Sequence, residues 1–321
     1  MRQIRLRRLR RRLGLYQPPA PKPKPMDPAS IRSRRKVFET LPDHPECPEG
    51  WTTGAPDFVI FGAQKSGTTW WFRLIEQHPG VVQPSNQRPE LHFFDRLWDE
   101  WPSEEHIARY HRYFPRPEGK LAGEKTPEYM NCAWVPPMVK LAAPEAKAIV
   151  LLRDPVDRYV SGLSHQDRGG LLDGQSMEGE LRVFGDRVRV VTDAIERGLY
   201  ATQLEWLLQQ YPADRLLVLQ YEACSADPAA QLARTFEFLG LPPHELPADE
   251  LVRPRNKSKL EKVRVPPEHQ ELLASYYWPE VERLRTLVPQ LDLGLWPHFA
   301  DRVTERSGQT STPATVAGVE A

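Results

Sequence analysis

The sequence predicts an α/β fold, a P-loop-like three-layer α/β/α arrangement with a central parallel sheet. Three short apolar runs carry this prediction, at residues 57–63, 146–154 and 214–222. Each run is typical of a strand that is buried on both faces. Each is also followed by a segment whose apolar residues recur at helical spacing. Strands that alternate with helices form βαβ units, so the strands should be parallel.

The helices expected from the pattern follow in chain order. The first should come after the turn that ends the first strand, and two others should begin just after the second and third strands. The expected helical segments are 68–78, one from Pro155, 178–210, 228–239 and 267–289. No internal repeat is found, so the elements should form one domain rather than an array.

The 321 residues are expected to divide into three parts. Residues 1–50 are rich in basic residues and proline and should be a disordered extension. Residues 51–303 should form a single α/β domain, and residues 304–321 a polar, disordered tail.

The net charge of zero is a cancellation between two unlike segments. Residues 1–36 hold 13 Lys/Arg and one acid, which gives +12, so residues 37–321 hold 30 basic and 42 acidic groups, which gives −12. As a helix, the basic segment would have a modest apolar stripe suited to an anionic membrane surface. It could also contact nucleic acid, but no nucleic-acid partner is expected because nothing else in the chain favours one. A disordered solubilising extension is the alternative.

The cysteines and the start of the chain bear on its location. Cys47, Cys132 and Cys224 lie far apart without a C-x-x-C pair, so neither a disulfide framework nor a zinc site is expected, and no metal is predicted. No apolar stretch follows the basic start, and no window of about 18 apolar residues occurs. We therefore expect a soluble cytoplasmic protein, with peripheral membrane contact through residues 1–36 as an option.

The turn after the first strand, Gly62–Trp70 (GAQKSGTTW), is a candidate anion site. A helix N-terminus presents unpaired N–H groups and the positive end of the helix dipole, and Lys65 adds a cation. The Walker A loop has its lysine after the second glycine, whereas Lys65 precedes Gly67, which argues against an ATP or GTP hydrolase. A capped helix with a surface lysine is the alternative, but the buried strand directly before the turn favours a phosphate loop.

A second candidate anion site follows the second predicted strand. Arg153 should lie at the carboxyl end of that strand, where open α/β sheets bind ligands, and Asp154 should cap the next helix. Arg158 and Ser161 share a helix face at i, i+3 spacing, and an arginine with a hydroxyl suits a phosphate monoester. An arginine that merely pairs with Asp157 or the cap is the alternative. Two such sites in one sheet suggest a nucleotide that is phosphorylated at both ends.

As a whole, the sequence resembles the sulfotransferase family, whose donor is 3′-phosphoadenosine 5′-phosphosulfate (PAPS). Residues 62–71 (GAQKSGTTWW) resemble the family's 5′-phosphosulfate loop, and residues 149–161 (IVLLRDPVDRYVS) resemble its 3′-phosphate segment. Further strings fit in the family's order, at 88–95, 122–130, 197–208 and 216–243. The resemblance covers about residues 57–299. It is strongest to the heparan sulfate type and its bacterial relatives, although the turn also resembles the cytosolic aryl and steroid branch.

The resemblance implies which residues bind the donor. The residues implied for the 5′-phosphosulfate are Lys65, Ser66, Gly67, Thr68 and Thr69, and those for the 3′-phosphate are Arg153 and Ser161. Trp70 matches an aromatic residue that flanks adenine, with a core helix residue as the alternative. Asn256, Lys257 and Ser258 match, loosely, a basic loop that closes over the donor.

The resemblance also implies a catalytic group. Glu90 matches the family's catalytic base, and His92 and Lys125 match residues beside the reacting centre. Lys65 should stabilise charge that develops on the leaving group. We expect burial beside apolar neighbours to raise the pKa of Glu90, which would suit a base near pH 7. Pro89 replaces the usual lysine before the base, and Thr69 stands where some heparan-type members have arginine, so the acceptor is the open question.

The function predicted from the sequence is sulfuryl transfer from PAPS to an acceptor hydroxyl, by in-line displacement and without a metal. The acceptor is expected to be a carbohydrate or glycoconjugate. One alternative is a P-loop nucleotide kinase, which would need ATP and Mg²⁺. The other is a sulfotransferase of a small phenolic or lipid alcohol.

Overall fold

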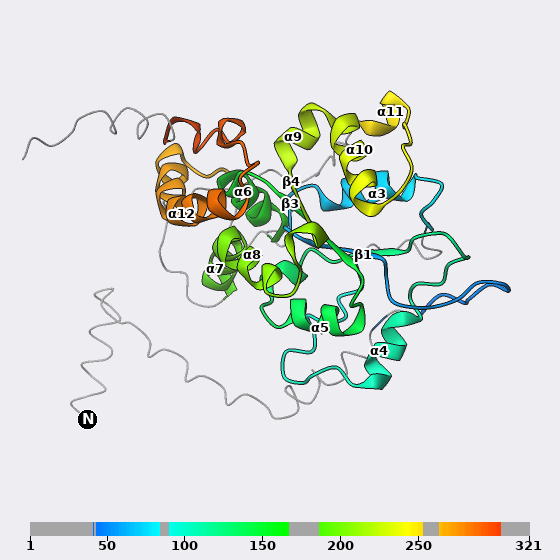
Figure 1. Ribbon diagram of the computed structural model, residues 1–321. Coiled ribbons are helices and arrows are strands. Elements are labelled where there is room, and N and C mark those ends of the chain that lie inside the picture. The colour runs from blue at the N-terminus through cyan, green and yellow to red at the C-terminus, as the bar shows by residue number, and fades with distance from the viewer. Residues whose placement is uncertain (1–40, 42, 84–89, 167–185, 253–262, 303–321) are drawn as a thin grey trace, which may run out of the picture. The chain divides into compact units, whose positions relative to one another are not determined.

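Four parallel strands form the central sheet, in the order β2–β1–β3–β4 (Figure 1). The strands are β1 (Phe58–Gly62), β2 (Gly123–Lys125), β3 (Lys147–Leu152) and β4 (Leu216–Gln220). The three apolar runs correspond to β1, β3 and β4, so the parallel sheet is confirmed. Because the strands are parallel, their carboxyl ends meet at one edge of the sheet, and the loops that carry the predicted site residues leave from that edge.

The computed structural model describes residues 41, 43–83, 90–166, 186–252 and 263–302, with the side chains of 165–190 excepted. Contacts within the chain divide it into Met1–Thr40 and Leu41–Ala321, and every described residue belongs to the second unit. The basic segment 1–36, the predicted loop residues 256–258 and the tail 304–321 lie outside the described residues.

Helices pack around the sheet and are joined to the strands by short turns. The α-helices are α3 (Thr68–Glu76), α4 (Glu104–His111), α5 (Val135–Ala142), α6 (Pro155–Gln166), α7 (Asp186–Glu196), α8 (Tyr200–Leu208), α9 (Tyr221–Ala226), α10 (Pro228–Leu239), α11 (Ala248–Leu251) and α12 (Pro267–Leu287). Short 3₁₀ turns are η2 (Tyr129–Asn131), η3 (Ala213–Arg215) and η4 (Leu293–Leu295). None of the helices formed by the described residues combines the length and apolar character that a bilayer crossing requires.

The sheet is the middle of three layers. Alternate strand residues, among them Ile60 and Leu151, pack against the buried faces of α3 and α10. On the opposite face, the ring of Phe61 contacts Tyr129 and Tyr211. Figure 1 shows α3 and α10 on one side of the strands and α5 and α8 on the other. The predicted α/β/α layering is thus present, and the sheet is covered on both faces, as an all-parallel sheet requires.

The predicted helix over 178–210 is two helices in the described part of that range, α7 and α8. They are separated at Gly198, where an added Cβ would lie 2.7 Å from the ring of Tyr277. Tyr277 itself donates a hydrogen bond to the carbonyl of Ile195 at 2.9 Å. The chain bends at Gly198 because only glycine allows the ring of α12 to approach the backbone so closely.

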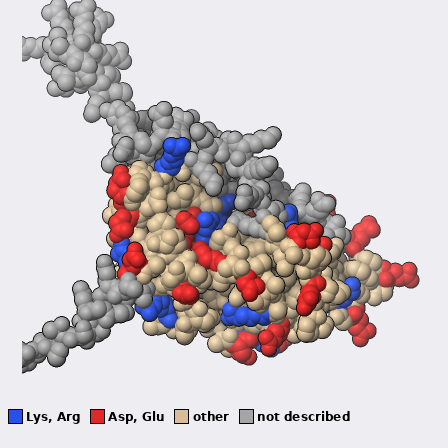
Figure 2. All heavy atoms as spheres, turned by 90° about the horizontal axis from the view of Figure 1, so that it is seen from above, with Lys and Arg blue, Asp and Glu red and all other residues tan. Residues whose placement is uncertain are grey.

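Both signs of charge lie on the described surface. On the face seen in Figure 2, acidic side chains are spread widely and basic side chains lie among them in small groups. A site for a polyanion must therefore rely on local groups rather than on the bulk charge of residues 37–321.

Candidate active site

The turn between β1 and α3 has the backbone geometry of an anion-binding loop. Gly67 is the N-cap of α3 with φ 85°, and an added Cβ would lie 2.9 Å from the ring of Tyr221. Lys65 also has positive φ, 70°, and Ser66 is fully buried beneath the turn. Among the described residues, no side-chain cap hydrogen bond is made at the start of α3, so the first N–H groups of this helix can donate to a ligand.

Arg153 brings the second predicted anion site next to the first. Its Nη1 donates to the carbonyl of Lys65 at 3.5 Å, and its guanidinium lies 5.1 Å from the centre of the Tyr221 ring. Its Nη2 also contacts Asp157 at 3.3 Å, so the pairing considered as the alternative is present as well. Among the described residues, the buried Nε of Arg153 has no hydrogen-bond partner. The arginine is thus held at the turn by weak contacts and retains a donor for an anion.

Arg158 and Ser161 have different surroundings despite their i, i+3 spacing. Arg158 is fully buried and donates a hydrogen bond from Nη2 to the carbonyl of Ala194, at the end of α7. Ser161 is partly exposed. Arg158 therefore joins α6 to α7 from inside the domain, and the 3′-phosphate contact remains a prediction for Arg153 and Ser161.

Trp70 lies in the core. It is 6% exposed, its ring packs edge-on against Trp71 and Tyr221, and its Nε1 donates to the carbonyl of Leu251 at 3.3 Å. These contacts fit the interpretation of Trp70 as a core helix residue, and its contact with adenine stays a prediction.

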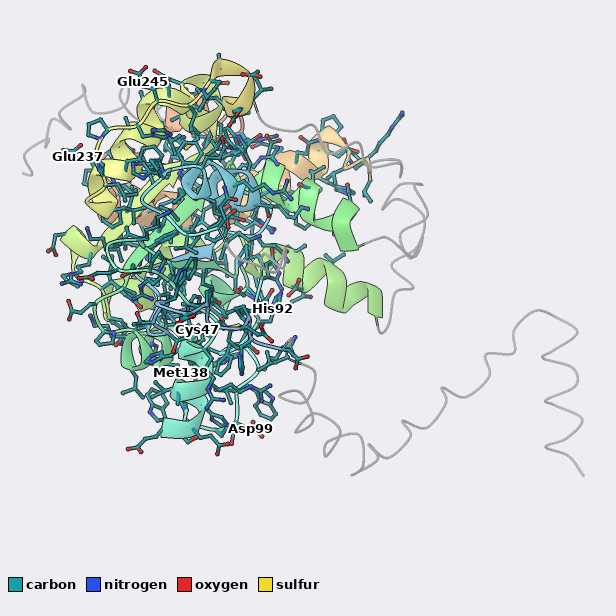
Figure 3. All side chains as sticks on the ribbon, turned by 90° about the vertical axis from the view of Figure 1, so that its right-hand side faces the viewer. Cys47, His92, Asp99, Met138, Glu237 and Glu245 are labelled. Atoms are coloured by element: carbon teal, nitrogen blue, oxygen red, sulfur yellow. The ribbon has the colours of Figure 1, made fainter. Side chains whose placement is uncertain are left out.

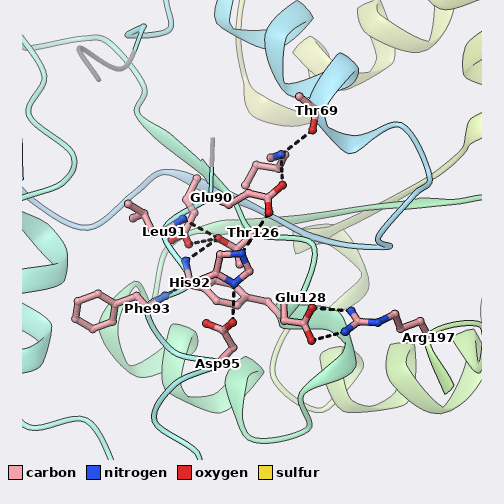
Figure 4. Close-up of polar contacts among 12 residues, drawn as sticks. Thr69, Glu90, Leu91, His92, Phe93, Asp95, Thr126, Glu128 and Arg197 are labelled. Carbon is pink, nitrogen blue, oxygen red and sulfur yellow. Dashed lines mark hydrogen bonds and ion pairs between the residues drawn. The ribbon is translucent and has the colours of Figure 1, made fainter. Parts of the chain in front are cut away.

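Lys125 joins the start of α3 to Glu90. It is the last residue of β2, paired in register with Ile60 of β1. Its Nζ donates to Oε1 of Glu90 at 2.6 Å and to Oγ1 of Thr69 at 2.8 Å (Figure 4). The side chain is fully buried, and burial lowers its pKa while the charge of Glu90 raises it. The lysine thus forms one cluster with a carboxylate 35 residues away in the sequence and a hydroxyl of α3 that is 56 residues away.

His92 completes the cluster from the other side of Glu90. Its Nε2 lies 3.3 Å from Oε2 of Glu90, and its Nδ1 lies 2.7 Å from Oδ2 of Asp95. The hydrogen bonds to Asp95 and Glu90 raise the pKa of His92 to about 10, against burial, which lowers it. In the view of Figure 3, His92 lies lower than Glu237 of α10 and higher than Asp99. The imidazole is therefore a cation between two carboxylates at neutral pH.

The expected direction of the Glu90 pKa shift was wrong. Burial does raise the pKa of this carboxyl, but the hydrogen bond from His92 and the charge and hydrogen bond of Lys125 outweigh it and lower the pKa to about 2. The apolar neighbours suggested a dry pocket, whereas the folded chain supplies two cations to the carboxylate. Glu90 is ionised at neutral pH in this arrangement.

The residues of β2 and its end alternate between two environments. Lys125 points toward α3 and Glu90, whereas Glu124 and Thr126 point into the core below. Glu124 accepts hydrogen bonds from Tyr110 and, at 2.9 Å, from Oγ1 of Thr126. Burial raises the pKa of Glu124 to about 7, although the hydrogen bonds of Tyr110, Tyr129 and Thr126 lower it. A short polar strand can lie in the core here because each buried polar group has a partner.

An arginine links α7 to the turn after β2. Arg197 makes a two-pronged ion pair with Glu128, at 2.6 and 2.8 Å, and contacts Asp193 at 2.8 Å (Figure 4). Such a fork fixes geometry as well as charge. The turn that follows Lys125 is thereby anchored to a helix from a distant part of the sequence.

Several residues of the cluster were missed from the sequence. They are Asp95, Glu124, Thr126, Tyr129 and Glu128. The i, i+3 spacing of His92 and Asp95 was a usable signal, because a carboxylate often orients the second nitrogen of a functional histidine. The other four lie in the string at 122–130 that resembles the family, but nothing in that string assigned them a role.

Comparisons with known proteins agree with the fold. A family model described as "Sulfotransferase domain" matches residues 55–274. Human heparan sulfate glucosamine 3-O-sulfotransferase 3B1 is 31% identical over 209 residues, which cover 63% of this chain and 51% of the relative. The mouse heparan sulfate glucosamine 3-O-sulfotransferase 6 is 30% identical over 226 residues, 70% of this chain and 62% of the relative. The chain thus spans roughly half of the length of the curated relatives it matches.

A solved structure is similar in fold. The crystal structure of a sulfotransferase from Alicyclobacillus acidocaldarius covers 76% of this chain, and this chain covers 99% of that one, with 22% sequence identity and a TM-score of 0.56. At this identity the similarity concerns the fold, and it supports the three-layer arrangement seen here.

Proposed function

Because the chain belongs to the sulfotransferase family, we propose that it transfers a sulfuryl group from PAPS to an acceptor hydroxyl. The observation that carries the proposal is the contact of Lys125 with both Glu90 and Thr69. A group bound at the N-terminus of α3 would lie beside a carboxylate that can accept a proton. Positioning and electrostatics of this kind are the main contributions of proteins to group transfer.

The residues around the turn fit the two anionic ends of the donor. Lys65, the hydroxyls of Thr68 and Thr69 and the open N–H groups of α3 suit the 5′-phosphosulfate. Arg153, whose buried Nε has no partner among the described residues, suits the 3′-phosphate together with Ser161. When bound, the donor supplies the sulfuryl group and a stable bisphosphate leaving group.

The proposed step is an in-line displacement at sulfur. The acceptor oxygen forms a bond to sulfur, the bond from sulfur to the bridging phosphate oxygen breaks, and the electron pair stays on that phosphate oxygen. Glu90 takes the proton of the acceptor hydroxyl. Lys65 stabilises the charge that grows on the bridging oxygen, and Lys125 and His92 hold Glu90 in place.

The low pKa of Glu90 gives Lys125 a second part in this proposal. A carboxylate with a pKa of about 2 is ionised but is a weak base. If the ammonium of Lys125 turns toward the transferring oxygens, Glu90 loses a cation, and its pKa rises as the hydroxyl proton arrives. The lysine would thus connect occupation of the donor site to the strength of the base.

For the acceptor, we propose a hydroxyl of a carbohydrate or glycoconjugate. The relatives named as heparan sulfate glucosamine 3-O-sulfotransferases support this class. Thr69, where heparan-type proteins can have arginine, favours an acceptor that differs from heparan sulfate in its charge near the donor helix.

The test measures transfer of radiolabelled sulfate from PAPS by the full chain. The acceptors are a glucosamine-containing oligosaccharide in sulfated and unsulfated forms, a simple phenol and a steroid alcohol. Calorimetry compares adenosine 3′,5′-bisphosphate with ATP and Mg²⁺. We expect tight binding of the bisphosphate and label on the oligosaccharide. Preference for ATP with phosphate transfer would overturn the proposal, and label on the phenol or steroid alone would overturn the acceptor class.

A further inference from the structure

Two buried hydroxyls bind the four consecutive backbone amides that directly follow Glu90. Oγ1 of Thr126 accepts the N–H groups of Leu91 at 3.2 Å and His92 at 3.5 Å. The hydroxyl of Tyr129 accepts the next two, from Phe93 at 3.0 Å and from Phe94 at 3.4 Å. Figure 4 shows the Thr126 contacts directly below Glu90. Segment 91–94, which we call the base loop, is thus bound along its backbone.

Both hydroxyls point their protons at one carboxyl group. A hydroxyl has one proton, so an oxygen that accepts N–H groups can still donate once. Thr126 donates to Oε1 of Glu124 at 2.9 Å, and Tyr129 is also hydrogen-bonded to Glu124. Glu124, Thr126 and Tyr129 are all buried. Glu124 therefore fixes the direction in which each hydroxyl offers its lone pairs to the base loop.

The base loop needs this support because of its backbone. His92 has φ 51°, in the left-handed region that residues with a side chain rarely adopt. Such conformations persist where surrounding contacts over-determine them, and they cluster at functional sites. Here the strained residue is the one whose Nε2 reaches Glu90. A return to extended backbone would swing the imidazole away from that carboxylate.

We propose that Glu124, Thr126 and Tyr129 are positioning residues, which hold Glu90 and His92 in their reactive arrangement through hydrogen bonds to the backbone of the base loop. This proposal rests on the proposed function, in which Glu90 accepts the proton. The three residues are buried under the base loop and act through it. A misplacement of about 1 Å at a reacting group costs up to about 100-fold in rate, so loss of these bonds should be visible in turnover.

The experiment replaces single hydroxyls at nearly constant shape. Thr126→Val and Tyr129→Phe each remove one hydroxyl, and Thr126→Ser retains it. Thr235→Val is the matched control, because Thr235 is also fully buried and its hydroxyl accepts from Trp71 at 3.2 Å. For each variant we measure kcat, affinity for adenosine 3′,5′-bisphosphate, and hydrogen exchange of the amides of 91–94.

We expect turnover and amide exchange to change while the affinity for the bisphosphate does not. Thr126→Val should lower kcat by about 10- to 100-fold and release the amides of 91 and 92, whereas Tyr129→Phe should release those of 93 and 94. Bisphosphate affinity should stay within about 2-fold, and Thr126→Ser should restore turnover. Thr235→Val should keep wild-type kcat at temperatures where it is folded.

Three results would overturn the proposal: unchanged kcat in Thr126→Val, unchanged exchange at 91 and 92, or an equal loss of kcat in Thr235→Val. Failure of the proposed function has a different signature, because the wild-type chain would then transfer no sulfate to any acceptor. In that case the exchange measurements would still decide whether the hydroxyls hold the base loop.

Discussion

Nζ of Lys125 lies 2.6 Å from Oε1 of Glu90, although the lysine side chain has no exposed surface. Each group depends on the other, since burial lowers the pKa of the lysine and the carboxylate opposes that shift. Removal of the carboxylate of Glu90 would leave a fully buried ammonium without its counter-ion, which is costly. The pair therefore contributes to the stability of the fold as well as to the chemistry proposed above.

Glu90→Gln should abolish transfer but keep the donor site. The amide cannot take a proton from the acceptor, so kcat should fall by about 10²- to 10⁴-fold. Affinity for adenosine 3′,5′-bisphosphate, measured by calorimetry, should change little. Glu145→Gln, at a carboxylate with 81% of its side chain exposed, is the control and should be active. Turnover in Glu90→Gln close to that of the control would refute the assignment of the base.

Lys65→Ala should weaken use of the donor. Loss of a cation beside the leaving group should lower kcat/KM for PAPS by on the order of 10²-fold, since charge stabilisation there is greatest in the transition state. Lys120→Ala removes a lysine with an exposed side chain and should behave as wild type. The measurement is kcat/KM for PAPS at a fixed acceptor concentration. A normal value in Lys65→Ala would contradict the role of this lysine.

Arg153→Ala should discriminate between nucleotides. A charge-assisted hydrogen bond contributes about 1.5–3 kcal/mol, so affinity for adenosine 3′,5′-bisphosphate should fall by about 10- to 100-fold. Affinity for adenosine 5′-phosphate, which lacks the 3′-phosphate, should change by less than about 3-fold. Equal losses for both nucleotides would mean that Arg153 supports the turn through Lys65 and Tyr221 and does not read the 3′-phosphate.

Stability should depend on pH through His92 and Glu90. The pKa of His92 is raised from 6.5 to about 10, so its contribution is complete below pH 6.5 and is lost as pH rises through 10. The pKa of Glu90 is lowered from 4.5 to about 2, so its contribution is present above pH 4.5 and is lost as pH falls through 2.

Urea unfolding of the wild type and His92→Gln across pH 6 to 10 checks the histidine. The difference in unfolding free energy should be largest near pH 6 and shrink toward pH 10. A difference that grows with pH would show that His92 is neutral in the folded protein and that Asp95 does not hold it as a cation.

The sheet could be predicted from the sequence in three of its four strands. β1, β3 and β4 are continuous apolar runs, and burial on both faces requires such runs. β2 was missed because its three residues, Gly-Glu-Lys, include two charged ones, which the apolar pattern excludes. Their partners, Tyr110 for Glu124 and Glu90 for Lys125, are remote in sequence.

The site was predictable where a motif is local and not where it is assembled by the fold. The turn at Lys65 and the strand end at Arg153 each appear in one short string. The resemblance implied that Glu90, His92 and Lys125 share a site, but nothing in their spacing gave the direction in which the pKa of Glu90 shifts. That direction depends on which cations the fold brings to the carboxylate, so it emerges only with the three-dimensional contacts.

The alternating directions of the side chains at the end of β2 limit where the length of the chain can vary. Glu124 and Thr126 point into the core, where they bond to each other and Glu124 accepts from Tyr110, and Lys125 points to α3. Because neighbouring strand residues face opposite ways, insertion or deletion of one residue here would put the lysine among the tyrosines and a core group beside Glu90. Length variation should thus be excluded from 124–126, yet tolerated at the exposed turn around Gly119, whose Cβ position has no neighbouring atom within 4 Å.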